Sequence, residues 1–164
     1  AITGSWAGAL GRPQFLPSVY LRLARDGDGD GYADIWKSEV DAMTSIANYL
    51  MNAGWRRNEP WGFAVNVPGS LDRTSIQSTL VPPRCARVFA RHSRWMRMSE
   101  WKQRGINVQN GVWPDDNMQA ALIEPDGQGQ TAYLLGSNYR AILDYNCSNF
   151  YALSAGLLAD AVRN

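Results

Sequence analysis

The spacing of apolar residues predicts two helices in the first third of the chain. Pro17 suits the first turn of a helix, where its missing N–H needs no partner, and the apolar face that follows comprises Val19, Tyr20 and Leu23. Ser38 is typical of an N-cap, with Asp41 three residues later, and Gly54 is typical of a helix stop. Between them, apolar residues recur at helical spacing at Val40, Met43, Ile46, Ala47 and Leu50. A loop rich in aspartate therefore joins two predicted helices.

The middle of the chain predicts less regular structure. Residues 55–83 are rich in Gly, Pro, Asn and Ser and contain one expected strand, Trp61–Val67. Helical spacing returns over residues 84–94, where one face would hold Arg84, Arg87, Arg91 and Arg94. That face is either a basic patch for an anionic polymer or a solvated surface, and the second interpretation is favoured. His92 has no Cys or acid at ligand spacing, so we interpret it as structural. A short helix, Glu100–Arg104, is expected after Ser99.

The last third predicts a small β-hairpin followed by helices. Gln119–Glu124 and Thr131–Leu135 flank a Gly-containing loop, which is typical of a hairpin. A helical turn begins at Asn138, and a final helix runs from about Ser148 to Val162, with Gly156 where a neighbour packs closely. No repeat, low-complexity tract or linker divides the chain. The sequence therefore predicts a single, mostly α (α+β) domain over residues 1–164.

Composition places the chain among globular proteins. It is 45% hydrophobic and 19% charged, and its net charge of +1 gives no reason to expect a nucleic acid or an acidic lipid as partner. No apolar run approaches the ~18 residues of a transmembrane segment. The first residue is Ala1 rather than Met, so we expect a processed or excised piece of a longer protein. Cys85 and Cys147 allow a single disulfide, and two buried thiols are the equal alternative.

The aspartate-rich loop predicts a calcium site. Asp26, Asp28, Asp30, the Tyr32 carbonyl and Asp34 occupy positions 1, 3, 5, 7 and 9 of an EF-hand-like loop, with Gly31 at the turn position. Position 12 holds Lys37 instead of the usual Glu, so Glu39 or Asp41 would have to close the site. The alternative is a solvated acidic turn. We favour the metal, because like charges at this spacing repel one another unless a cation holds them.

The sequence offers few candidate residues for nucleophilic or general acid catalysis. One histidine supports no Ser/His/Asp or Cys/His arrangement, and no phosphate-binding or dinucleotide-binding motif is present. The remaining possibility is a carboxylic acid acting on a glycosidic oxygen. The sequence contains four glutamates, Glu39, Glu59, Glu100 and Glu124. None is predicted to lie in the apolar environment that would raise the pKa of a carboxyl group.

Several segments in register resemble the membrane-bound lytic murein transglycosylase B family. The first is GSWAGALGRPQFLPS, residues 4–18. The likeness continues through the aspartate-rich loop, Trp36, Val40–Ala42, Ser45–Tyr49 and Gly54–Trp55. It returns at Asn138–Tyr139, Ile142–Leu143 and Tyr145–Asn146, and then at Ser148, Tyr151 and Ala152. It covers both ends of the chain and is weakest over residues 70–95.

The resemblance implies a lysozyme-like fold and an activity on peptidoglycan in the bacterial periplasm, with or without a lipid anchor. This family cleaves the β-1,4 bond between N-acetylmuramic acid and N-acetylglucosamine and leaves a 1,6-anhydro end. It carries calcium in an EF-hand-like loop, which Asp41 would close here. By motif, glycan strands would be bound by Ser5, Gln14, Tyr49, Tyr145, Asn146 and Tyr151.

The resemblance also implies that the catalytic acid lies outside this sequence. In the family that Glu belongs to a motif (Glu, Ser or Thr, any residue, Tyr or Phe, Gly) upstream of the segment that matches residues 4–18, and these 164 residues lack it. We therefore expect the C-terminal part of a lytic transglycosylase, whose partner is the missing N-terminal part. The alternatives are a calcium-stabilised peptidoglycan-binding module without catalysis and a goose-type lysozyme that hydrolyses its substrate.

Overall fold

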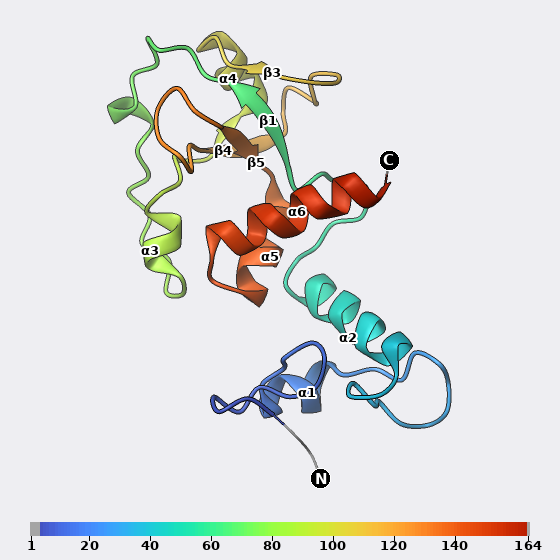
Figure 1. The fold of residues 1–164 in the computed structure, drawn as a ribbon. Coiled ribbons are helices and arrows are strands. Elements are labelled where there is room, and N and C mark those ends of the chain that lie inside the picture. The colour runs from blue at the N-terminus through green and yellow to red at the C-terminus, as the bar shows by residue number, and fades with distance from the viewer. Residues whose placement is uncertain (1–3, 164) are drawn as a thin grey trace. The chain divides into compact units, whose positions relative to one another are not determined.

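A computed structural model describes residues 4–163, and the chain divides into two compact units, residues 1–53 and 54–164 (Figure 1). Each unit is compact through contacts among its own residues. The expected single domain over residues 1–164 stays a prediction. No helix in the described part of the chain has the length and apolar character required to cross a membrane.

The first unit contains the two predicted helices, α1 (Pro17–Leu23) and α2 (Glu39–Asn52). Pro17 stands at the start of α1, and the Ser38 hydroxyl accepts a hydrogen bond from the Asp41 N–H at 3.2 Å, which confirms both helix-start predictions. The end of α1 is bonded to α2, because the Asn48 side-chain amide donates to the Leu23 carbonyl at 2.8 Å. This arrangement fixes both ends of the loop that joins the helices.

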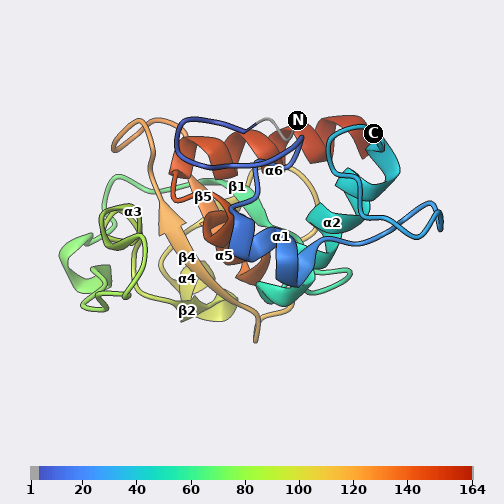
Figure 2. The ribbon, with the colours of Figure 1, turned by 90° about the horizontal axis from the view of Figure 1, so that it is seen from below.

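The second unit is built on a five-stranded antiparallel sheet with the order β2–β4–β5–β1–β3. Its strands are β1 (Gly62–Asn66), β2 (Met96–Arg97), β3 (Asn107–Val108), β4 (Gln119–Ile123) and β5 (Tyr133–Leu135). The predicted hairpin is confirmed as β4–β5, with Leu122 opposite Leu134, and Figure 2 shows these two strands side by side. The sheet is larger than predicted because β1 joins the other edge of β5, with Phe63 opposite Leu134.

One face of the sheet packs on a core around Trp101. This residue lies in α4 (Met98–Gln103), is fully buried, and donates from its indole N–H to the Ala120 carbonyl at 3.1 Å. Val65, Ile106 and Leu134 are buried in the same cluster. Full burial of a large aromatic ring with its N–H satisfied contributes strongly to stability. The sheet and α4 therefore share one hydrophobic core.

A second core joins the C-terminal helices α5 (Ser137–Tyr145) and α6 (Asn149–Arg163) to Trp61, just before β1. The indole N–H of Trp61 donates to Asp160 on α6 at 2.8 Å. Gly156 faces the same ring, and a Cβ built there would lie 2.5 Å from Trp61 Cδ2. The prediction that something packs closely on Gly156 is thereby confirmed.

The predicted helix over residues 84–94 is wrong for most of its length. Only α3 (Ala86–Phe89) forms, after Cys85 in a left-handed conformation with φ of 58°. Beyond it, the Ser93 N–H donates to the Leu122 carbonyl at 2.9 Å and the Arg94 N–H to the Ile76 carbonyl at 2.7 Å. Long-range backbone pairing thus overrides local helical spacing here. The four arginines consequently do not share a helical face.

The start of α4 also differs from the prediction. Its N-cap is Arg97 rather than Ser99, since the Glu100 carboxylate accepts from the Arg97 N–H at 2.9 Å. A single turn of 3-10 helix, η1 (Thr74–Ile76), lies in the region predicted as irregular. Gly105, with φ of 80°, follows the end of α4 as expected.

The two cysteines form a disulfide. Cys85 and Cys147 are bonded, with their Cα atoms 5.4 Å apart and a sequence separation of 62. The sequence allowed either a disulfide or two buried thiols, and the structure contains the disulfide. The disulfide ties the start of α3 to the short connection between α5 and α6.

Candidate functional site: an acidic loop, two sets of sugar-binding candidates and a groove

The aspartate-rich loop of the first unit is folded around its own carboxylates. The two oxygens of Asp26 accept from the Gly29 N–H at 2.6 Å and the Gly31 N–H at 2.8 Å. These bonds, the Gly31 bond first, hold the pKa of the Asp26 carboxyl below its ordinary value. Gly31 has φ of 94°, which a glycine adopts without strain, as the turn position of the motif requires. The loop therefore keeps Asp26 ionised.

Asp41 connects this loop to α2. Its side chain is fully buried, and its two oxygens accept from the Gly27 N–H at 2.7 Å and the Asp34 N–H at 2.8 Å. Asp26, Asp28 and Asp41 each offer a carboxylate oxygen, and these oxygens all lie within 4.8 Å of one another. Three hard oxygen donors on a glycine-rich loop fit calcium, and a buried carboxylate beside two others needs a compensating positive charge.

The other predicted calcium ligands have local partners. Asp30 accepts from the Tyr32 N–H at 2.8 Å, and Asp34 accepts from the N–H groups of Trp36 and Lys37, both at 3.0 Å. Neither belongs to the group of three carboxylates within the described residues. Their roles as ligands, and that of the Tyr32 carbonyl, stay predictions.

The sugar-binding candidates of the first unit lie on its N-terminal segment and on α2. Ser5 is exposed, and its hydroxyl accepts from the Ala9 N–H at 3.1 Å. Gln14 has φ of 53°, and its amide donates to the Gly11 carbonyl at 2.7 Å. The Tyr49 ring lies 5.7 Å from that of Phe15, which pairs through its backbone with Leu10. The roles of these three residues in sugar binding stay predictions.

The sugar-binding candidates of the second unit come together at the connection between α5 and α6. The rings of Tyr145 and Tyr151 are parallel, with centroids 6.3 Å apart and planes 2° apart. Asn146 is the C-cap of α5, with its N–H donating to the Ile142 carbonyl at 3.1 Å. Cys147 follows directly, so the disulfide holds the segment that carries this group. The connection thus carries two parallel aromatic rings, and Asn146 directly follows Tyr145 in sequence.

Each of the four glutamate carboxylates has a partner, at distances between 2.5 and 3.0 Å. The partners are the Arg12 side chain for Glu39, the Ser137 hydroxyl for Glu59, the Arg97 N–H for Glu100 and the Arg73 side chain for Glu124. Glu124 binds Arg73 through both of its oxygens, and this contact raises the pKa of Arg73 above its ordinary value. None of these carboxylates is a free acid in an apolar pocket.

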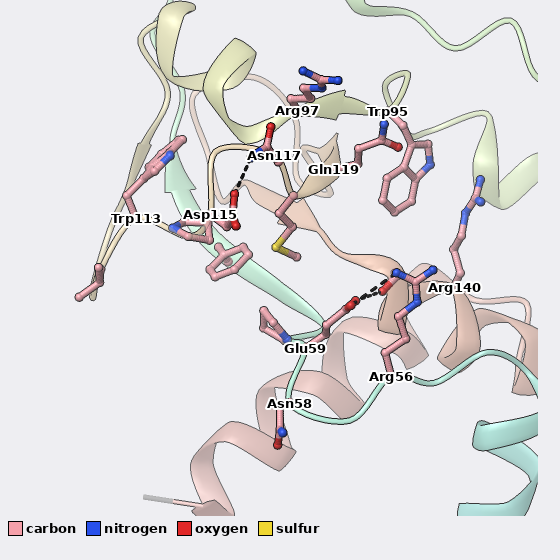
Figure 3. A pocket seen from close by; sticks show the side chains of 16 residues that line it. Arg56, Asn58, Glu59, Trp95, Arg97, Trp113, Asp115, Asn117, Gln119 and Arg140 are labelled. Atoms are coloured by element: carbon pink, nitrogen blue, oxygen red, sulfur yellow. Dashed lines mark hydrogen bonds and ion pairs between the residues drawn. The ribbon is translucent and has the colours of Figure 1, made fainter.

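Sequence reasoning missed a groove of about 960 Å³ in the second unit (Figure 3). Its polar lining comes from Arg56, Asn58, Glu59, Arg97, Asp115, Asn117, Gln119, Ser137 and Arg140, and its apolar lining from Pro60, Phe63, Trp95, Val112, Trp113, Pro114 and Met118. These residues come from segments spread over residues 56–140, so no local spacing reveals them. The high Trp content was the one signal in the sequence.

The sequence matches the family described as the transglycosylase SLT domain over residues 1–160. It is 30% identical over 164 residues to membrane-bound lytic murein transglycosylase B of Escherichia coli (strain K12). The match covers 98% of this chain and 40% of that protein, so the chain spans well under half the length of this curated relative.

Two solved structures show the same fold. SltB3 of Pseudomonas aeruginosa, in complex with NAG-anhNAM-pentapeptide, has 40% sequence identity and a TM-score of 0.83, with 99% of this chain and 40% of that chain covered. The Escherichia coli lytic transglycosylase Slt35, in complex with calcium, has 29% identity and a TM-score of 0.72, with 99% and 46% covered. The fold is thus a lysozyme-like lytic transglycosylase fold of the α+β class. The chain belongs to the transglycosylase SLT domain family, as its motifs indicated.

Proposed function

We propose that this chain is part of a peptidoglycan lytic transglycosylase that cleaves the β-1,4 bond between N-acetylmuramic acid and N-acetylglucosamine and leaves 1,6-anhydro ends. The observation that carries the proposal is the family match over residues 1–160, within which the motifs of the sugar-binding candidates lie. A relative with 40% identity binds a fragment that contains the anhydro sugar. The protein would act on glycan strands in the bacterial periplasm; a relative with 30% identity is named as a membrane-bound enzyme that acts on murein.

In this function, the residues of the chain bind and orient the glycan. Tyr145 and Tyr151 offer parallel rings for sugar contacts, and Asn146, the next residue after Tyr145, would offer its side-chain amide. Ser5, Gln14 and Tyr49 would contribute from the first unit. We place the general acid outside the four glutamates, a placement that is supported by the partner that each of their carboxylates already has in an arginine, a hydroxyl or a backbone N–H. An acid from the N-terminal part of the enzyme would protonate the leaving oxygen.

The activity is tested by incubating purified sacculi with the whole protein that carries this sequence and, separately, with residues 1–164. The whole protein should release muropeptides with 1,6-anhydro ends. Residues 1–164 should bind sacculi but should release no muropeptides. Reducing ends would show hydrolysis of the lysozyme type instead. Release by residues 1–164 at the rate of the whole protein would show that the acid lies within them. Binding without release by the whole protein would favour the calcium-stabilised binding module.

We also propose that the aspartate-rich loop binds calcium through Asp26, Asp28 and Asp41, with Asp30, Asp34 and the Tyr32 carbonyl as further ligands. The proximity of three carboxylates and the burial of Asp41 support this, and a relative of this fold was solved with calcium. When bound, the ion would neutralise the loop and join it to α2. The role is structural, because the ion would connect the two ends of the loop.

Calcium binding is tested by thermal unfolding after chelation and after calcium is added back. A ligand that binds only the folded state at 100 times its Kd stabilises it by about 2.7 kcal/mol, so the melting temperature should rise. Asp41→Asn should abolish the response, whereas Asp72→Asn in the second unit should retain it. An equal melting temperature with and without calcium in the unsubstituted protein would refute the proposal. Magnesium provides a second control, since it demands a stricter octahedral geometry.

A further inference from the structure

The groove of the second unit has the size and lining of a ligand site, and none of the sugar-binding candidates lines it. Its volume of about 960 Å³ lies at the upper end of the usual range for ligand pockets, roughly 300–1,000 Å³. Trp113 lines one side and Trp95 the other (Figure 3), and Phe63 is a third aromatic residue of the lining. A groove with aromatic walls at both sides suits an extended chain rather than a single small ion.

Arg140 is the main charged group of the groove. Its guanidinium lies 4.7 Å from the centre of the Trp95 ring and 5.7 Å from that of Phe89. The side chain stays exposed, and among residues 4–163 no carboxylate lies within ion-pair distance of it. Stacking on a ring orients a guanidinium and leaves its N–H groups available. Arg140 is thus held ready to bind an anion.

The charges of the groove leave a positive excess. Glu59 is satisfied within the groove by Ser137 and Arg56, at 2.5 and 3.5 Å. Asp115 accepts the Asn117 N–H at 2.7 Å. Arg97, exposed at the end of β2, likewise has no carboxylate within ion-pair distance in the described part of the chain. The groove therefore holds three arginines and two carboxylates, an excess of one positive charge, and neither Arg140 nor Arg97 is in an ion pair within residues 4–163.

We propose that this groove binds the peptide stems of peptidoglycan, with Arg140 and Arg97 taking their free carboxylates and the aromatic walls taking the backbone and apolar side chains. The proposal rests on the proposed function for its substrate. A neutral glycan would use the aromatic rings and could accept hydrogen bonds from the guanidinium groups, but it would leave both of them without a charged partner. A peptide with free carboxylates uses both features, because guanidinium groups bind carboxylates in a bidentate manner.

Binding of an isolated stem pentapeptide to the whole protein that carries this sequence tests the proposal by calorimetry. The same pentapeptide with its carboxylates converted to amides is the matched ligand. Arg140→Gln and Arg97→Gln should each weaken binding of the free pentapeptide by about tenfold or more, as expected for the loss of one charge-assisted contact. Arg87→Gln, an exposed arginine of α3 outside the groove, should bind as the unsubstituted protein does. The amidated peptide should bind at least about tenfold more weakly than the free one.

Because this assay contains no glycan, its outcome is independent of cleavage. Cleavage of sacculi without binding of the pentapeptide would overturn the peptide site and leave the proposed function standing. Equal affinity for the free and amidated peptides would also overturn the peptide site. The same conclusion would follow if a neutral glycan oligomer bound the unsubstituted protein and did not bind Arg140→Gln. Circular dichroism of the variants identifies any loss of fold. Should Arg140→Gln unfold, the exposed Arg97 alone decides the result.

Discussion

Removal of the Cys85–Cys147 disulfide should destabilise the second unit by about 4 kcal/mol. The bond closes a loop of 62 residues, and the chain-entropy relation for a loop of this length gives roughly 4 kcal/mol at 25 °C. The closed loop contains β2 to β5 and α5, so the unfolded chain without the bond gains freedom over most of the unit. This loss is a large part of the ~5–15 kcal/mol that stabilises a typical domain.

The assay is urea unfolding of the unsubstituted protein and of the double variant Cys85→Ala, Cys147→Ala. Tryptophan fluorescence reports mainly on the second unit, which contains five of the seven tryptophans: Trp55, Trp61, Trp95, Trp101 and Trp113. With m-values of about 1–3 kcal/mol per M, the midpoint should fall by roughly 1–4 M. The reduced unsubstituted protein should behave like the double variant. A midpoint that changes by less than the equivalent of ~1 kcal/mol, or two free thiols titrated in the denatured, unreduced protein, would refute the reasoning.

Two further predictions concern the core of the second unit. Gly156→Ala should cost about 1–3 kcal/mol by overpacking against Trp61, whereas Gly69→Ala, where a Cβ meets no atom within 4 Å, should be nearly neutral; equal urea midpoints for the two variants would contradict this. Burial lowers the pKa of His92, so below its unfolded pKa of about 6.5 the unfolded state binds more protons. As the pH is lowered below about 6.5, the free energy of unfolding should therefore decrease. His92 contributes at most ~1.4 kcal/mol per pH unit to this decrease. Urea unfolding between about pH 7.5 and 5 should show a shallower slope in His92→Gln, and an equal slope would contradict the assignment.

Much of the fold is local enough to be predicted from sequence. The start of α2, the strand β1 and the β4–β5 hairpin follow from a cap, flanking prolines and a glycine turn. The two-residue strands β2 and β3 could not be predicted, because two residues carry no alternation of apolar and polar positions. The residues around Ser93 have helical spacing, yet their N–H groups pair with Leu122 and Ile76 far along the chain.

The candidate sites likewise differ in how far they could be predicted from the sequence. The aspartates of the loop lie within nine residues, so a linear motif identified them, and Asp41 was implied by the family resemblance. A linear motif cannot tell which carboxylates lie close together, as those of Asp26, Asp28 and Asp41 do, and which lie outside that group, as Asp34 does. The groove was beyond sequence reasoning, because Arg56, Trp95 and Arg140 meet only once the sheet and α5 are assembled.

The strand order has a consequence for how the chain acquires its structure during synthesis. β1 is synthesised before both strands that pair with it, β3 and β5. Gly62, for example, pairs with Leu135, which is 73 positions later in the chain. By contrast, every pairing described for the loop and its two helices is complete once residue 53 has emerged. Long-range strand pairing slows folding, and domains generally fold as units from the N-terminus. On the ribosome, the aspartate-rich loop should therefore close early, while the edge of β1 that pairs with β5 remains unpaired until the β4–β5 hairpin has emerged.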